Sequence, residues 1–129
     1  MELANNFCGI EFDWFAIDVT GAIGLFSTGG WGPIPKEVLW HAEQHQQLSN
    51  QFALPNAGTL AIWDDFARYG LYVFDWKPYE GPYLRVAQPL AKPDGGIKQT
   101  ILTLPDLLLL PVSFHEAKYI IIKYFNLLH

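Results

Sequence analysis

Residues 11–27 of the 129-residue chain read EFDWFAIDVTGAIGLFS, two apolar runs separated by a short turn-like stretch. The first run, residues 11–18, is rich in aromatic and β-branched side chains, which favour strands. Asp18 and Gly21 then occupy the first and fourth positions of a four-residue turn, where these residue types are preferred. Residues 22–27 predict the returning strand. The sequence therefore predicts a β-hairpin over residues 11–27.

Two helices are predicted after the hairpin. The intervening stretch TGGWGPIP, at residues 28–35, contains three glycines and two prolines, which excludes regular structure. Apolar residues at helical spacing then predict a helix over residues 36–48. A second, short helix is predicted over residues 62–69, because Asp64 and Asp65 would lie in its first turn, where carboxylates complement the helix dipole.

The end of the chain carries conflicting signals. Ser113 and Glu116 fit a capping box for a helix over residues 117–128. The run YIII at residues 119–122 is aromatic and β-branched, which favours a strand. We expect a strand over residues 118–125. The other predicted strands span residues 71–76, 83–88 and 97–104.

The order of these elements predicts the fold class. Strands and helices are segregated along the chain rather than alternating, which is typical of α+β proteins. The length corresponds to one domain. We therefore expect a single α+β domain over residues 1–129, with a mainly antiparallel sheet of about six strands and two helices inserted after the first hairpin.

Charge is distributed unevenly along the chain. Half of the residues are hydrophobic and 16% are charged, which excludes intrinsic disorder. Residues 1–65 carry eight acids and one lysine, a net charge of −7, whereas residues 66–129 carry a net charge of +2. An acidic surface repels phosphate and suits a basic protein partner. We expect such a partner and no nucleic acid.

Cysteine content and hydropathy predict the compartment. The single cysteine, Cys8, excludes an internal disulfide and suits a reducing environment. The longest apolar run, residues 107–112, is far shorter than the roughly 20 residues that a membrane-spanning helix needs. Residues 1–6 lack the basic and apolar regions of a signal peptide. We expect a cytoplasmic protein without a membrane partner.

Two histidines on the first predicted helix have the spacing of metal ligands. His41 and His45 lie four residues apart and share a helix face, an arrangement that can bind zinc. In the metalloprotease motif a glutamate follows the first histidine directly, but here Ala42 does, and Glu43 points away. Zinc needs three or four ligands, and the spacing indicates no third one, which His115, Cys8 or an aspartate would have to supply from elsewhere in the fold. The alternative is a water-exposed polar helix face, and we expect no cofactor.

Signals for catalysis are weak. A pair of aspartates can perform acid–base chemistry when their environments separate their pKa values, but each aspartate here also suits a turn or a helix start. The glycine-rich stretch lacks the lysine and hydroxyl residue of a phosphate-binding loop. An enzyme or ligand-binding domain with an aromatic-lined pocket containing histidine and aspartate remains the alternative function. The aspartates considered are Asp13, Asp18, Asp64, Asp65 and Asp75.

Aromatic residues are abundant: five tryptophans, six tyrosines and nine phenylalanines. One small domain is not expected to bury all of them, and aromatic residues are frequent at interface hot spots. Trp31, in the middle of the glycine–proline stretch, is the leading candidate for an exposed anchor. Trp76, Tyr79 and Tyr83 also lie beside turns.

We therefore predict a non-catalytic protein-binding domain. Trp31 would be its aromatic anchor, and acidic side chains would form a negative rim around the anchor. A homo-oligomeric structural protein, in which surplus aromatics meet across a symmetric interface, is a second alternative. The predicted rim residues are Asp13, Glu43, Asp64 and Asp65.

A longer pattern is shared with a known group of proteins. It reads WFAID at residues 14–18, GAIGLFSTGG at residues 21–30 and GPIP at residues 32–35. It resembles the opening of small bacterial proteins, some of which look like immunity proteins of contact-dependent or polymorphic toxin systems. The resemblance covers about the first quarter of the chain and assigns no functional residue. It implies a cytoplasmic, cofactor-free protein that neutralises a toxin by occlusion.

Overall fold

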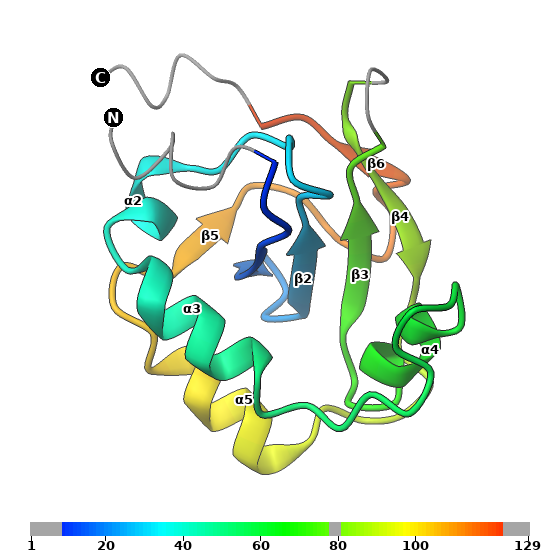
Figure 1. Cartoon of the computed structure of the whole chain (residues 1–129). Coiled ribbons are helices and arrows are strands. Elements are labelled where there is room, and N and C mark those ends of the chain that lie inside the picture. Colours follow the sequence, from blue (N-terminus) through cyan, green and yellow to red (C-terminus); the bar gives the residue numbers. More distant parts are fainter. Residues whose placement is uncertain (1–8, 78–80, 123–129) are drawn as a thin grey trace.

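The computed structural model describes residues 9–77 and 81–122, which form one α+β domain (Figure 1). Six strands make a single sheet in the order β5-β1-β2-β3-β4-β6. The predicted fold class and strand number are thus confirmed. The elements are β1 (Asp13–Asp18), β2 (Ile23–Ser27), α2 (Lys36–Leu39), α3 (Ala42–Ser49), α4 (Ile62–Ala67), β3 (Tyr72–Asp75), β4 (Tyr83–Ala87), α5 (Gly95–Leu102), β5 (Leu108–Leu110) and β6 (Tyr119–Ile120).

The predicted hairpin is present as β1 and β2. The two strands pair antiparallel, with Trp14 opposite Phe26. The Gly21 N–H donates to the Asp18 carbonyl at 3.1 Å and closes the turn. Gly21 has a φ of +84°, a left-handed conformation that glycine adopts without strain. The turn residues therefore act as the sequence predicted.

The sheet is mixed rather than mainly antiparallel. β2 pairs parallel with β3, and β1 pairs parallel with β5, whereas the other three pairings are antiparallel. Parallel neighbours need a long crossover, which α2, α3 and α4 supply between β2 and β3. Three helices therefore follow the hairpin instead of two. The predicted helix over residues 36–48 is interrupted at His41, whose φ of −129° and ψ of 35° are not helical.

The strand predicted over residues 97–104 is wrong, because most of this segment belongs to helix α5. The Asp94 carboxylate accepts a hydrogen bond from the Ile97 N–H at 2.9 Å and caps the helix. Ile97 and Ile101 are buried four residues apart, on one helix face. Their β-branched side chains favoured a strand, but the cap and the spacing decide the structure.

Two strands near the C-terminus differ from expectation. β5 lies in the apolar run at residues 107–112, which had no predicted strand. The strand predicted over residues 118–125 is present only as β6, Tyr119–Ile120, and residues 123–125 lie outside the described residues. No helix within residues 9–77 or 81–122 is long and apolar enough to cross a membrane.

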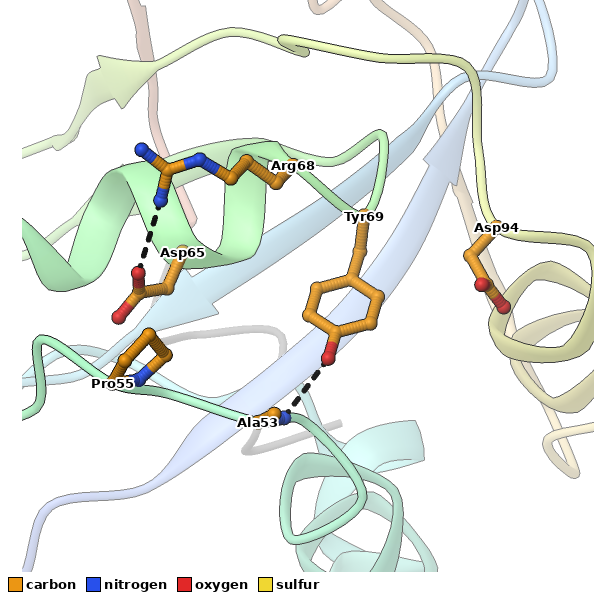
Figure 2. Close-up of a pocket in the computed structure, with 6 residues that line it drawn as sticks. All are labelled: Ala53, Pro55, Asp65, Arg68, Tyr69 and Asp94. Atoms are coloured by element: carbon orange, nitrogen blue, oxygen red, sulfur yellow. Dashed lines mark hydrogen bonds and ion pairs between the residues drawn. The ribbon is translucent and has the colours of Figure 1, made fainter.

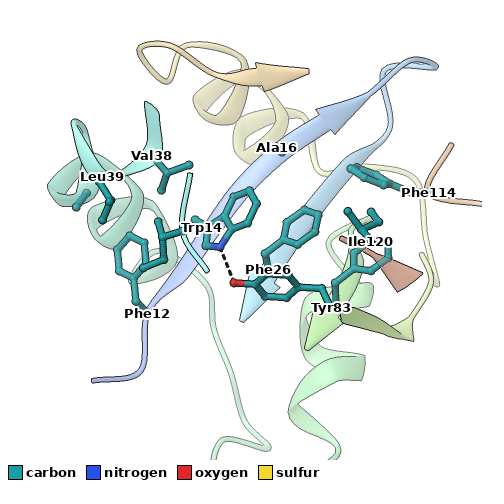
Figure 3. Packing of buried hydrophobic residues seen from close by; sticks show 12 residues of the cluster. Phe12, Trp14, Ala16, Phe26, Val38, Leu39, Tyr83, Phe114 and Ile120 are labelled. Carbon is teal, nitrogen blue, oxygen red and sulfur yellow. Dashed lines mark hydrogen bonds between the residues drawn. The ribbon is translucent and has the colours of Figure 1, made fainter. Parts of the chain in front are cut away.

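The sheet separates two hydrophobic cores. One face, here called the aromatic face, carries Trp14, Phe26, Phe74 and Tyr83 (Figure 3). On it the Trp14 ring stacks on Phe26 at 4.2 Å between centroids, and Trp14 Nε1 donates to Tyr83 Oη at 3.2 Å. The other face, here called the helix face, packs against side chains of α3, α4 and α5. Alternation along each strand thus gives both faces an apolar surface.

Candidate functional site

Three acidic side chains gather where β1 begins and β2 and β3 end. Strand register places Asp13 opposite Ser27, and Ser27 opposite Asp75. Paired residues of neighbouring strands point to the same face, so the two aspartates flank Ser27 on the helix face. Glu11 acts electrostatically on both aspartates. We call Glu11, Asp13 and Asp75 the acidic rim.

Burial and neighbouring charges shift the pKa values of two carboxyls of the acidic rim. Burial raises the pKa of the Asp13 carboxyl from 3.8 to about 6, hydrogen bonds from Ser27 and Ser49 oppose the rise, and the charges of Glu11 and Asp75 add to it. Burial also raises the pKa of Asp75, as does Glu11, while Lys77 lowers it.

Among the described residues, no lysine or arginine nitrogen lies at ion-pair distance from Asp13 or Asp75. Ser49 Oγ, from the end of α3, is instead 3.3 Å from Asp13 Oδ2. Such a site can hold a proton near neutral pH, and it can receive a cation.

Exposed apolar side chains lie at the same end of the sheet. The Gly9 N–H donates to the Gly30 carbonyl at 2.8 Å, and the Thr28 N–H donates to the Phe12 carbonyl at 3.0 Å, so residues 9–12 run beside residues 28–30. Trp31 is 58% exposed and Ile10 is 53% exposed. The predicted exposure of Trp31 is confirmed. Exposed aromatic side chains are enriched in protein interfaces.

The other predicted rim residues do not join this site as a group. Glu43 is exposed on α3, and Asp64 is exposed on α4, which leads into the opposite end of β3 (Figure 1). Asp65 is buried, so its assignment to an exposed rim is wrong. Its carboxylate accepts hydrogen bonds from the Asn56 N–H and Nδ2, both at 2.8 Å, and from Arg68 Nη1 at 3.2 Å. Asp65 therefore anchors the preceding loop.

Three further aromatic residues were expected to be exposed beside turns. Tyr83 was expected at the surface, but it is buried, because its hydroxyl donates to the Pro33 carbonyl at 2.8 Å and holds the 28–35 stretch on the aromatic face. Trp76 is half-buried. Tyr79 lies outside the described residues.

The histidine pair has separate contacts. His45 is buried and its Nδ1 accepts the Phe15 N–H at 3.1 Å, so the expectation of a water-exposed face is wrong for this residue. The pairing of β5 with β1 covers Ala16 to Asp18, so the Phe15 N–H lies outside it and donates to His45 of α3 instead. Burial and the nearby His41 lower the pKa of His45 to about 4, so its imidazole is neutral, with the proton on Nε2.

His41 points to a different partner. Its Nε2 lies 2.8 Å from Asp106 Oδ2, in the loop before β5. In the described part of the chain, no three histidine, cysteine, aspartate or glutamate side chains are grouped to hold a metal ion. Cys8 lies outside that part. The spacing of His41 and His45 therefore serves packing and loop contacts in this structure.

A cavity of about 360 Å³ lies between the loop after α3, helix α4 and the start of α5 (Figure 2). Its polar groups already serve the fold. Tyr69 Oη accepts the Ala53 N–H at 3.0 Å, Asp65 binds Asn56, and Asp94 caps α5. It contains one aromatic side chain and no histidine, so it differs from the aromatic-lined pocket of the alternative function. The lining residues are Ala53, Pro55, Asp65, Arg68, Tyr69 and Asp94.

Replacing Asp65 by alanine is expected to lower the free energy of unfolding by about 2–3 kcal/mol, because the partly buried Asn56 donors lose their acceptor. Asp64→Ala is the matched control, since this neighbouring acid is exposed, and its effect should stay within about 0.5 kcal/mol. Urea denaturation of both variants measures the difference. Equal losses would contradict the anchoring role.

Sequence reasoning found only part of the acidic rim. It named Asp13 for partner binding and considered Asp75 only as a member of an acid–base pair. Glu11 was not singled out. Comparison of the chain with protein-family models, characterised proteins and solved structures gives no match. The resemblance to immunity proteins therefore stays a prediction.

Proposed function

We propose that this protein is a non-catalytic binding domain for a basic protein partner. The contact surface is the acidic rim together with Trp31 and Ile10. The observation that carries the proposal is the position of Asp13 and Asp75, which flank Ser27 at a sheet end without a lysine or arginine at ion-pair distance among the described residues. A basic side chain of the partner supplies that charge.

The two parts of the surface have different energetic roles. Removing Trp31 and Ile10 from water on binding provides apolar contact area, and aromatic anchors carry much of the affinity in protein interfaces. The carboxylates attract the partner over distance and select against acidic proteins. The 28–35 stretch presents Trp31 in a fixed position, because the N–H groups of Trp31 and Gly32 both donate to the Thr28 carbonyl, at 3.1 and 2.8 Å.

The resemblance of residues 14–35 to immunity proteins makes a toxin domain the partner class to test first. This segment contains Trp31 and also Ser27, the residue that Asp13 and Asp75 flank. Neutralisation by occlusion requires only a surface of complementary shape and charge. The absence of a recognised catalytic motif in the sequence is compatible with that mode of action.

The test is a pull-down from the source organism's lysate at low and moderate salt, with an Asp13→Asn, Asp75→Asn double variant. We expect the wild type to retain a basic protein at low salt and to lose it as salt rises. The rim variant should weaken the measured Kd for that protein about tenfold or more, since two charge contacts are lost. Trp31→Ala should weaken it at both salt concentrations.

The control is an Asp64→Asn, Glu116→Gln double variant, which changes the net charge equally at exposed positions. If the rim and control variants lose partner affinity equally, the effect depends on net charge alone, and the proposed surface is contradicted. Binding that does not depend on salt would contradict its electrostatic part. A wild-type protein that recovers only its own chain would favour the homo-oligomer instead.

A further inference from the structure

One C-terminal segment closes both edges of the sheet. β5 pairs with β1 at one edge, and β6 pairs with β4 at the other. The intervening residues 111–118 cross the aromatic face, and Phe114 is buried there (Figures 1 and 3). We call residues 108–120, drawn in orange to red in Figure 1, the strap.

The strap pairs with the rest of the sheet over only part of its length. β5 pairs through three residues and β6 through two. Of the strap, Phe114 and Ile120 are buried, Leu109 is 58% exposed, and the other apolar side chains that pack on the core are only partly buried. Segments with short pairing and few buried side chains open most readily in native proteins.

The Phe114 peptide is held from two sides. Its N–H donates to Asp18 Oδ2 at 2.7 Å, and its carbonyl accepts from Arg85 Nη1 at 2.8 Å. Arg85 Nη1 also donates to the neighbouring His115 carbonyl at 2.6 Å. The second oxygen of Asp18, Oδ1, accepts from the Thr20 and Ala22 N–H groups and from Thr20 Oγ1. Asp18 and Arg85 thus fix the strap to the hairpin and to β4.

We propose that the strap opens as one unit while the rest of the domain stays folded, and that Asp18 and Arg85 set how often it opens. What remains is the four-stranded sheet β1–β4 with its helix face still covered by α3, α4 and α5, and such a sheet is large enough to be stable. Opening exposes Phe26 and Phe74 on the aromatic face and frees the outer edges of β1 and β4. This inference does not depend on the proposed function.

Amide hydrogen exchange measured residue by residue tests the proposal. In the wild type, after correction for intrinsic rates, we expect the strap amides to exchange at least about tenfold faster than the central sheet amides. The strap amides include those of Phe114 and Ala117, together with that of Arg85, which donates to the Lys118 carbonyl. The central amides are those of β2 and β3, which are paired on both sides within the four-stranded sheet.

Two variants separate strap opening from global unfolding. Asp18→Asn keeps Oδ1 for the turn but turns an amide donor toward the Phe114 N–H, so we expect the strap amides to exchange about 10–100 times faster. If Asp18→Asn does not fold, Arg85→Lys replaces it, and we expect a smaller increase in the exchange rate of the strap amides. Ile101→Ala, in the helix-face core, should accelerate the central amides and leave the strap amides unchanged.

Two results would contradict the opening of the strap as a separate unit. Strap and central amides that exchange with one common opening free energy in the wild type would show that the strap is lost only when the whole domain unfolds. In that case Ile101→Ala accelerates both sets of amides by the same factor. Either observation overturns the proposal, and neither bears on partner binding.

Discussion

Replacing Phe114 by alanine is expected to lower the free energy of unfolding by about 4 kcal/mol. The ring is fully buried, with its centroid 5.3 Å from that of Phe74 and 5.9 Å from that of Phe26. It also occupies the space above Gly24, where a Cβ would lie only 2.8 Å from the ring. Because Asp18 and Arg85 hold the Phe114 backbone, the strap cannot easily move inward to fill the cavity. The expected loss therefore lies within the usual range of about 3–5 kcal/mol for the replacement of a buried phenylalanine by alanine.

Urea denaturation measures this loss. Leu109→Ala is the matched control, because it truncates an exposed apolar side chain of the same strap and should change stability by about 0.5 kcal/mol or less. If Phe114→Ala does not fold, Phe114→Leu gives a smaller loss in the same direction. A loss for the Phe114 variants no larger than that of Leu109→Ala would show that the ring does not hold the aromatic face together.

Local sequence predicts the hairpin but not the rest of the sheet. The β1–β2 turn depends on residues 18–22 alone, so its pattern is readable. β5 pairs with β1 through Ala16 and Leu108, which are 92 positions apart, and four consecutive leucines show no alternation to indicate a strand. Helix α5 was missed although Asp94 is a good cap, because β-branched residues favoured the competing interpretation.

The candidate site was only partly predictable for the same reason. Asp13 and Asp75 are joined through the parallel pairing of β2 with β3, which follows from the crossover and not from any local pattern. Asp64 and Asp65 are adjacent aspartates at a helix start, so the local sequence does not distinguish which of them is exposed. In the structure, Asn56 of the loop before α4 donates to the Asp65 carboxylate, so Asp65 is buried whereas Asp64 is exposed.

Asp13→Asn is expected to stabilise the protein at pH 7.5 by about 2 kcal/mol, which raises Tm by roughly 8 °C for a domain of this size. The pKa of Asp13 is raised from 3.8 to about 6 in the folded state, chiefly by burial. Full linkage gives about 3 kcal/mol for that shift, and partial access of solvent to the carboxylate reduces the figure. Asparagine removes the charge and keeps an oxygen that can accept from Ser27 and Ser49.

The pH dependence fixes the sign of this effect. A raised pKa means that the folded state binds the proton more tightly than the unfolded state does. The contribution of Asp13 is therefore fully favourable below about pH 3.8 and is lost as pH rises to about 6. The stability difference between variant and wild type should be near zero at pH 4, grow between pH 4 and 6, and stay constant above. Asp18, whose pKa is lowered because its hydrogen bonds from Phe114, Thr20 and Ala22 outweigh burial, changes both proteins equally and cancels in the difference.

Thermal denaturation of both proteins from pH 4 to 8 measures this difference, with Asp64→Asn as the control of equal charge change. The Asp13 carboxylate destabilises the folded chain, and within residues 9–77 and 81–122 it forms no ion pair. If the acidic rim is the contact surface, a basic side chain of the partner compensates this charge in the complex. Asp13→Asn should then move stability and partner affinity in opposite directions at pH 7.5. A stabilised variant with unchanged affinity would support the destabilising effect of the Asp13 charge. It would contradict the placement of the acidic rim in the binding surface. A variant with unchanged stability would show that the charge of Asp13 is already compensated in the free protein.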